Sequence, residues 1–263
     1  MKSLTQAVSA DGTAIAYEAI GRGNPVILIG GAFNDRRTVT PLAEALAPSL
    51  TAIAYDRRGR GDSGKAATTT VEREVDDIAA LIEAVGAPVA LFGHSSGAAL
   101  ALEAAAAGLP VRQVAVYEPS YVVDRSRPRP GRDLADRVRA LVALGRRDDA
   151  AALFLTEAIG MPAEVTEGMK AGPMWQMFSG LAHTVPDDVA ACRGMRLPAE
   201  RFATLEVPVL AVNGSNTAPW LAAATKSVAL TIPGARLVVL EGQDHGVLHN
   251  PGSLVPVLID FLA

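Results

Sequence analysis

The sequence has little of several things, and each shortage excludes a class of protein. Its 263 residues include a single cysteine, Cys192, so no disulfide can form within the chain and a reducing compartment is expected. No stretch approaches the roughly 18 uninterrupted apolar residues of a membrane-spanning helix. The opening residues 1–10 contain no continuous apolar segment, so we expect no signal peptide. These absences predict a cytoplasmic protein that does not interact with a membrane.

An excess of positive charge is also missing. The 24 lysines and arginines are outnumbered by 28 aspartates and glutamates, which gives a formal net charge of −4. A face that binds nucleic acid needs a basic excess, so no nucleic-acid partner is expected. Hydrophobic residues make up 49% of the chain, and its length suffices for one large core with an accessory lobe. The partner that remains is a small-molecule substrate.

Short apolar segments alternate with segments of helical period through most of the chain. Near-continuous apolar strands separated by helices are typical of a parallel sheet covered on both faces, so the fold class is α/β. The expected strands are Thr13–Ala19, Pro25–Ile29, Thr51–Tyr55, Pro88–Phe92, Gln113–Tyr117, Val207–Val212 and Arg236–Leu240. The expected helices between them are Thr40–Ala47, Val71–Val85, Ala98–Ala107, Pro219–Leu230 and Ser253–Leu262. Leu4–Val8 is expected to pair with the first strand as a hairpin around Asp11-Gly12.

One region interrupts the alternation. Residues 121–205 contain no convincing strand, and we expect them to form a helical lid inserted into a core made of residues 1–120 and 206–263. The expected lid helices are Asp133–Leu144, Asp148–Ile159, Pro162–Lys170 and Pro173–His183. The lid contributes apolar candidates for a substrate pocket, which could equally pack the lid onto the core. They are Met174, Trp175 and Phe178, with Phe154, Met169 and Met177 as further members.

The most informative motif is Gly93-His94-Ser95-Ser96-Gly97. It is a GxSxG pentapeptide directly after an expected strand and directly before an expected helix. Such a turn exposes the serine hydroxyl at the carboxyl end of the sheet, and glycines leave room for its cramped backbone. The motif therefore predicts that Ser95 is a nucleophile. A Gly/Ser-rich turn without chemistry is the simpler alternative.

A serine nucleophile needs a base, and histidine is the usual one. His245 follows the last expected strand and can return to the rim that presents Ser95, so we favour it, with His249 as the fallback. His94 is expected to be structural, and His183 to lie in the lid. The i,i+4 spacing of His245 and His249 lacks a following glutamate and a third ligand, so no metal site is predicted.

The third member of such a triad is a carboxylate that orients the imidazole. Its usual place is the loop after Val207–Val212, but no aspartate or glutamate occurs between Val207 and Leu240. Glu118 ends the preceding expected strand at the same rim, so we predict that it takes this role. Asp124 is its main competitor.

Donors to the oxyanion are expected on two segments. The backbone N–H of Ser96 follows the nucleophile at a helix N-terminus. The second N–H is assigned to Ala32 in the Gly30-Gly31-Ala32-Phe33 loop, where Phe33 is expected to wall the substrate pocket. The segment Gly59–Gly64 matches GxGxxG, but no helix opens there, so no dinucleotide cofactor is predicted.

Taken with the Asp56–Ser63 loop and the insertion after Glu118, these motifs resemble the α/β-hydrolase superfamily over nearly the whole chain. Two features depart from it: Gly30-Gly31 replaces the familiar His-Gly, and the acid after the penultimate strand is missing. Haloalkane dehalogenases and zearalenone-type lactone hydrolases look similar in placing a glutamate where Glu118 lies. Dehalogenases and epoxide hydrolases use an aspartate nucleophile, so Ser95 argues against both of those chemistries.

The resemblance implies a cofactor-free serine hydrolase that cleaves an ester, thioester or lactone of a medium-sized hydrophobic molecule through an acyl-enzyme. Two alternatives stay open. A hydrolase-fold protein with a displaced acid could bind a ligand with little turnover, or the same pocket could carry cofactor-free lyase or cyclase chemistry.

Overall fold

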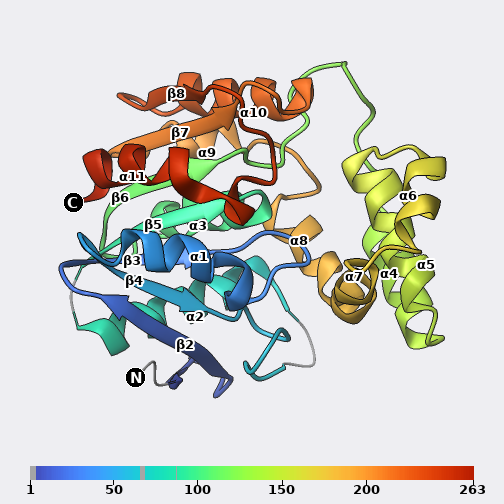
Figure 1. Cartoon of the computed structure of the whole chain (residues 1–263), viewed down its shortest axis with the longest axis horizontal. Coiled ribbons are helices and arrows are strands. Elements are labelled where there is room, and N and C mark those ends of the chain that lie inside the picture. Colours follow the sequence, from blue (N-terminus) through green and yellow to red (C-terminus); the bar gives the residue numbers. More distant parts are fainter. Residues whose placement is uncertain (1–3, 66–68, 87) are drawn as a thin grey trace.

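The computed structural model describes residues 4–65, 69–86 and 88–263. In these residues, eight strands form one sheet in the order β1-β2-β4-β3-β5-β6-β7-β8 (Figure 1). The strands are β1 (Thr5–Val8), β2 (Ala14–Gly21), β3 (Asn24–Ile29), β4 (Leu50–Tyr55), β5 (Val89–His94), β6 (Val111–Tyr117), β7 (Val209–Gly214) and β8 (Arg236–Leu240). The hairpin β1–β2 is antiparallel, β2 runs antiparallel to β4, and the pairs from β4 to β8 are parallel. The predicted mostly parallel sheet is confirmed, with strand ends shifted by a residue or two.

Helices cover both faces of this sheet, because successive residues of a buried strand point to opposite sides. In β3, Val26 and Leu28 belong to one apolar core, and Ile27 and Ile29 to the other. The first core is closed by α1 (Arg36–Leu46) and α11 (Leu254–Leu262). The second is closed by α2 (Val71–Val85), α3 (Ser96–Ala106) and α10 (Pro219–Thr231). The five predicted core helices are all present.

The segment between β6 and β7 forms a helical insertion, the name used below for residues 121–205. Its described residues contain no strand. Figure 1 shows α4 to α7 standing beside the sheet at its right-hand end, with α8 between them and the core. The insertion consists of α4 (Leu134–Ala143), α5 (Arg147–Phe154), a π-helical turn (Leu155–Ile159), α6 (Ala163–Met169), α7 (Trp175–Leu181), a 3₁₀ turn (Ala182–Thr184), α8 (Val185–Ala191) and α9 (Ala199–Phe202).

Two details of the insertion differ from the predicted helices. The expected helix Asp148–Ile159 divides into α5 and the π-helical turn. Helices α8 and α9 were not predicted: α8 has 7 residues, with a proline and two aspartates after its first residue, and α9 has only 4 residues. Within the described residues, no helix is long and apolar enough to cross a membrane.

Candidate active site

Ser95 lies on a sharp turn between β5 and α3. Its backbone has φ 58° and ψ −120°, a conformation that costs a non-glycine residue about 1–3 kcal/mol. The Ser95 N–H donates to the Tyr117 carbonyl at 2.9 Å. A Cβ on Gly93 would lie 2.3 Å from the Gly97 carbonyl oxygen, and one on Gly97 would lie 2.2 Å from the Ile29 oxygen. The two motif glycines are therefore required, because three backbone segments meet around this turn.

Glu118 and His245 lie together at the same rim of the sheet. Glu118 follows β6 and is completely buried, while the His245 side chain is 40% exposed. His245 Nδ1 lies 2.6 Å from Glu118 Oε2, and Glu118 Oε1 accepts the backbone N–H of Gly214 at 2.9 Å. Both carboxylate oxygens therefore accept a hydrogen bond, and the proton in the bond to His245 belongs on Nδ1. In a neutral ring of this tautomer, Nε2 carries the lone pair that a base requires.

The end of β7 explains how this acid can come from β6. In the sequence, the loop after this strand lacks a carboxylate, and in the structure the N–H of Gly214, the last residue of β7, donates to Glu118. The glutamate side chain thus reaches across from the neighbouring strand. The geometry joins the predicted acid to the predicted base.

In the described residues, Ser95 Oγ makes no hydrogen bond with His245. It lies 3.0 Å from Ser120 Oγ instead, although Ser95 and His245 line one cavity. Catalytic hydrogen bonds often form only once substrate is bound. Ser120, which lies two residues after Glu118, was not predicted.

His94 packs against His245, the predicted base. Its Nε2 lies 2.9 Å from the His245 carbonyl oxygen, and the two rings are 4.6 Å apart. Burial, followed by the nearby charge of His245, lowers the pKa of His94 to about 3. His94 is therefore neutral near pH 7 and holds the loop that carries His245.

The competing candidates lie in other surroundings. His249 also lines the cavity, but it is exposed. Asp124 is exposed and accepts bonds from the backbone and hydroxyl of Ser126. His183 is bonded to the Gly59 carbonyl at 2.9 Å. None of these three residues forms a hydrogen bond with Ser95, Glu118 or the His245 side chain in the part of the chain that the structure describes.

The Gly30–Phe33 loop, predicted to donate to the oxyanion, lies against Ser95. A Cβ on Gly31 would lie 2.8 Å from Ser95 Cβ, so only glycine fits there without displacing the loop. Ala32, the next residue, lines the cavity with Ser95. Ser96 is the first residue of α3, and its N–H has no acceptor within the helix. Both predicted donors thus border Ser95.

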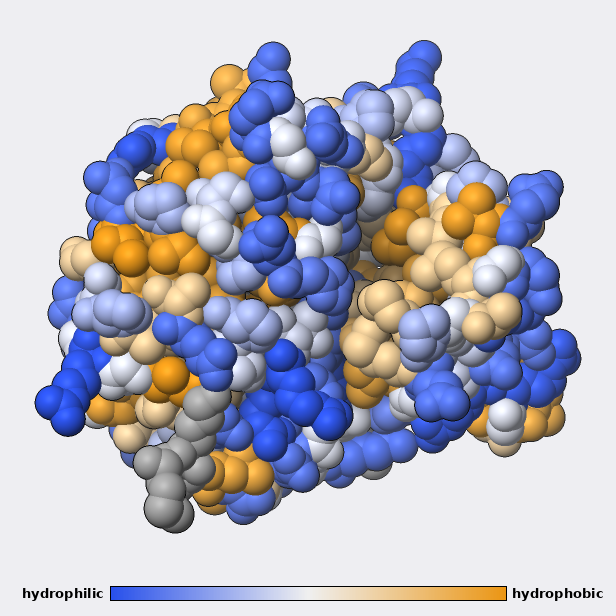
Figure 2. Space-filling view, viewed as in Figure 1, coloured by the Kyte–Doolittle hydropathy of each residue, from blue (hydrophilic) through white to orange (hydrophobic). Residues whose placement is uncertain are grey.

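The cavity between the core and the insertion has a volume of about 870 Å³. Figure 2 shows a hollow between the two parts, with apolar residues beside it. Of the residues predicted to contact substrate, Phe33, Met174 and Phe178 line it. The structure corrects the position of Trp175: its ring is buried in the insertion and packs edge-on against Phe178. The Trp175 indole N–H donates to Asp148 at 2.9 Å, which points the ring away from the cavity.

Comparisons with known proteins agree with this fold. The model of the alpha/beta hydrolase family matches residues 26–257. The chain belongs to this family. A comparison with curated proteins found no match.

Solved structures show the same fold for this alpha/beta hydrolase. An alpha/beta hydrolase from Sphaerobacter thermophilus DSM 20745 is 46% identical, with a TM-score of 0.92 over 98% of this chain and 99% of that one. An esterase from Rhodococcus sp. ECU1013 is 23% identical, with a TM-score of 0.71 over 99% and 100%. A 2-hydroxy-6-oxo-6-phenylhexa-2,4-dienoate hydrolase from Rhodococcus sp. strain RHA1 is 18% identical, with a TM-score of 0.70 over 99% of each chain. The predicted α/β-hydrolase fold is confirmed.

A buried ionic network supports the Gly30–Phe33 loop of this hydrolase. Asp188, on α8, accepts bonds from Arg57 at 2.6 Å, from Arg60 at 2.9 Å and from the Ser96 hydroxyl at 2.6 Å. Burial by itself raises the pKa of Asp188, but the charges of Arg60 and Arg57 hold it below its usual range. The carboxylate is therefore ionised, and it ties the helical insertion to the first residue of α3.

The same arginines reach the loop directly. Arg60 donates to the Gly31 carbonyl at 2.6 Å, and Arg57 donates to the Gly30 carbonyl at 3.3 Å. These bonds fix the backbone on which Ala32 lies. This network was not predicted from the sequence, although three arginines within the Asp56–Ser63 segment would be expected to need acidic partners.

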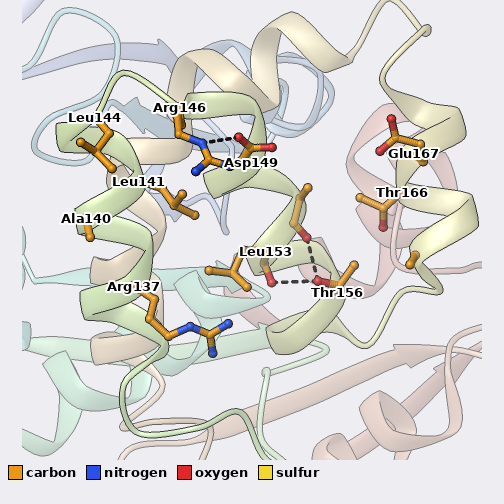
Figure 3. Close-up of a pocket in the computed structure, with 12 residues that line it drawn as sticks. Arg137, Ala140, Leu141, Leu144, Arg146, Asp149, Leu153, Thr156, Thr166 and Glu167 are labelled. Carbon is orange, nitrogen blue, oxygen red and sulfur yellow. Dashed lines mark hydrogen bonds and ion pairs between the residues drawn. The ribbon is translucent and has the colours of Figure 1, made fainter.

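A second hollow lies on the insertion, away from Ser95. Figure 3 shows it between α4, α5 and α6, with a volume of about 540 Å³. Its polar groups are already paired: Arg146 bonds to Asp149, and the Thr156 hydroxyl donates to the backbone of its own helix. None of its lining residues belongs to the cavity around Ser95. In the part of the chain that the structure describes, no cluster of histidine, cysteine and acidic residues is suited to a metal ion.

Proposed function

We propose that the protein is a cofactor-free serine hydrolase that cleaves an ester, thioester or lactone of a medium-sized hydrophobic molecule. One observation carries this proposal: the buried Glu118 carboxylate is bonded to His245 Nδ1 at 2.6 Å, in a loop that shares the cavity of Ser95. A carboxylate-oriented imidazole beside a serine on a strained turn is the arrangement that activates a hydroxyl.

The reaction follows from these positions. Ser95 Oγ attacks the substrate carbonyl carbon, while His245 Nε2 takes the hydroxyl proton. The N–H groups of Ala32 and Ser96 stabilise the negative oxygen, where each donor contributes roughly 3–4 kcal/mol. His245 then gives its proton to the leaving oxygen, and the C–O bond to the leaving group breaks. Water, deprotonated by His245, hydrolyses the acyl-enzyme and restores Ser95.

Glu118 stabilises the charged imidazole in both halves of the reaction. Because it is buried and accepts a second bond from Gly214, it cannot turn away from His245 without leaving that N–H unpaired. The rigid acid keeps Nε2 directed into the cavity.

Hydrolysis of p-nitrophenyl acetate tests the proposal. The wild-type protein should release p-nitrophenol, and Ser95→Ala or His245→Gln should reduce kcat by several orders of magnitude. His249→Gln is the matched control, because His249 lines the same cavity; it should retain most of the activity. Equal activity in wild type and Ser95→Ala would refute the proposal.

A binding protein is the second candidate, and one observation favours it. Ser95 Oγ is paired with Ser120 rather than with His245, the arrangement expected of a hydroxyl that does not react. Under this alternative, the apolar cavity would hold a ligand unchanged. A Ser120→Ala variant separates the two candidates, because an esterase should keep or gain activity when the competing partner is removed.

A further inference from the structure

Ser95 lies between two hollows of very different size. The outer cavity, of about 870 Å³, was described above. The inner hollow has a volume of only about 20 Å³ and lies between Ser95 and the helical insertion. Ser95 and Ala32 border both. Several residues line the inner hollow but not the outer cavity, among them Ser96, Ser120, Ala158, Val189, Cys192 and Met195.

The position of His245 distinguishes the two hollows chemically. His245 lines the outer cavity and does not line the inner hollow. In acyl transfer, the imidazole protonates the leaving oxygen, so the leaving group must lie within hydrogen-bond reach of it. The leaving alcohol therefore belongs in the outer cavity. The acyl group, which stays bonded to Ser95 after the alcohol departs, is left with the inner hollow.

The inner hollow is small and its walls are firm. A cavity needs a volume of roughly 10–15 Å³ to hold one water molecule. The inner hollow, with about 20 Å³, therefore accommodates one methyl-sized group. Three of the wall residues, Ala158, Cys192 and Met195, are at most 3% exposed. They belong to the apolar core that α2, α3 and α10 close. A longer chain would have to displace buried side chains, which is costly in a close-packed interior.

The outer cavity has the opposite character. Its walls include Phe33, Met161, Met177, Phe178 and Leu248, and flexible methionines adapt to ligands of different shape. The ring of Phe178 lies 4.9 Å from that of Phe33, so part of this wall is aromatic. This cavity fits a bulky apolar alcohol.

We propose that the enzyme is selective for open-chain esters that join a two-carbon acyl group to a bulky apolar alcohol. This inference rests on the proposed serine hydrolase function. In the reaction, Ser95 Oγ forms a bond to the acetyl carbon as the bond to the alcohol oxygen breaks. The Ser95 proton passes through His245 to that oxygen, and water then releases acetate.

An acyl-length series tests the inference with the wild-type protein. The p-nitrophenyl esters of acetate, butyrate and octanoate share one leaving group and differ only in the acyl chain. We expect kcat/KM to fall at least about tenfold from acetate to butyrate, because added methylenes in a confined pocket change it by about 10–200-fold, and to fall further for octanoate. Octanoate turned over as fast as acetate would overturn the inference.

The alcohol side is tested with acetates of increasing size. From methyl to benzyl to naphthylmethyl acetate, kcat/KM should rise, because the larger alcohols fill the outer cavity. A constant or falling kcat/KM along this series would contradict the assignment of the alcohol to that cavity.

Met195→Ala tests the wall itself. The smaller side chain enlarges the inner hollow and should shift the preferred acyl chain from acetate to butyrate. The matched control is Met177→Ala, a methionine of the outer cavity, which should leave the acyl preference at acetate. If Met195→Ala folds poorly, Cys192→Ala removes an atom from the same wall and should narrow the ratio of acetate to butyrate kcat/KM. An unchanged ratio in every folded wall variant would overturn the inference.

Labelling by a fluorophosphonate separates the two possible failures. If Ser95 is labelled but long acyl chains are preferred, the size inference fails and the serine hydrolase function stands. If Ser95 is not labelled and neither series is hydrolysed, the proposed function fails and the inference fails with it.

Discussion

The Glu118→Gln substitution tests the unusual position of the acid. Glutamine has the size of glutamate, so packing is preserved, but only one of its two terminal atoms can accept a hydrogen bond. The N–H of Gly214 donates to Oε1 of Glu118, which fixes the amide oxygen on that side. The amide NH₂ must then face Nδ1 of His245, where the carboxylate oxygen now lies at 2.6 Å.

The consequence for His245 is a change of tautomer. An NH₂ group donates to Nδ1, which must therefore be unprotonated, and the ring proton moves to Nε2. A protonated Nε2 cannot accept the proton of Ser95. The corresponding loss in a serine protease is about 10⁴-fold in kcat, so we expect a loss of about 10³–10⁴-fold, equivalent to about 4–5.5 kcal/mol of activation free energy.

The assay is kcat and KM for p-nitrophenyl acetate, with the thermal unfolding midpoint as a check on folding. KM should change little, because Glu118 is buried behind the imidazole. Asp124→Asn is the matched control: Asp124 was the competing acid, and its carboxylate is exposed and bonded to Ser126. Near-normal kcat for Glu118→Gln, or an equal loss in Asp124→Asn, would refute the reasoning.

Three further predictions concern the surroundings of the site. Gly31→Ala should lower kcat by about 10²–10³-fold, since its methyl group would lie 2.8 Å from Ser95 Cβ and push the oxyanion loop away; unchanged kcat would contradict the position of the oxyanion donors. Asp188→Asn should lower the free energy of unfolding in urea by about 3–5 kcal/mol, because two buried arginines lose their shared carboxylate. The control is Asp187→Asn, measured at pH 8. Burial and neighbouring carboxylates raise the pKa of Asp187 to about 7, so its negative charge at pH 8 is unfavourable. The variant should therefore be no less stable than wild type. His94 has a pKa of about 3 in the folded protein and about 6.5 in an unfolded chain, so its contribution is present above pH 6.5 and is lost as pH falls. Between pH 7 and pH 5 the wild type should lose about 2 kcal/mol more unfolding free energy than His94→Gln, and equal losses would contradict this assignment.

The sheet could be predicted because its strands are short, apolar and separated by clear helical periods. The segment Val89–His94 is one such strand, and every one of its residues is buried. The position of Glu118 could be predicted for a different reason: the usual site of the acid contained no carboxylate, and the preceding strand ended in one.

Other parts of the site depend on contacts that sequence patterns do not encode. Asp188 contacts Ser96, which lies 92 positions away in the sequence, and it lies on α8, a helix that was not predicted. Ser120 was missed because a hydroxyl near a strand end has no distinctive pattern. Trp175 was expected to contact substrate, but its bond to Asp148 turns it into the insertion. An apolar side chain in a helical insertion can face the cavity or the interior, and composition does not distinguish the two.

The role of Ser95 as nucleophile is tested by measuring the mass of the intact protein after exposure to a fluorophosphonate, followed by peptide mapping. We expect one adduct per chain, attached to Ser95, and no adduct in His245→Gln over the same exposure. A protein whose mass is unchanged, or whose adduct lies on a serine other than Ser95, would contradict the assignment of Ser95 as the nucleophile.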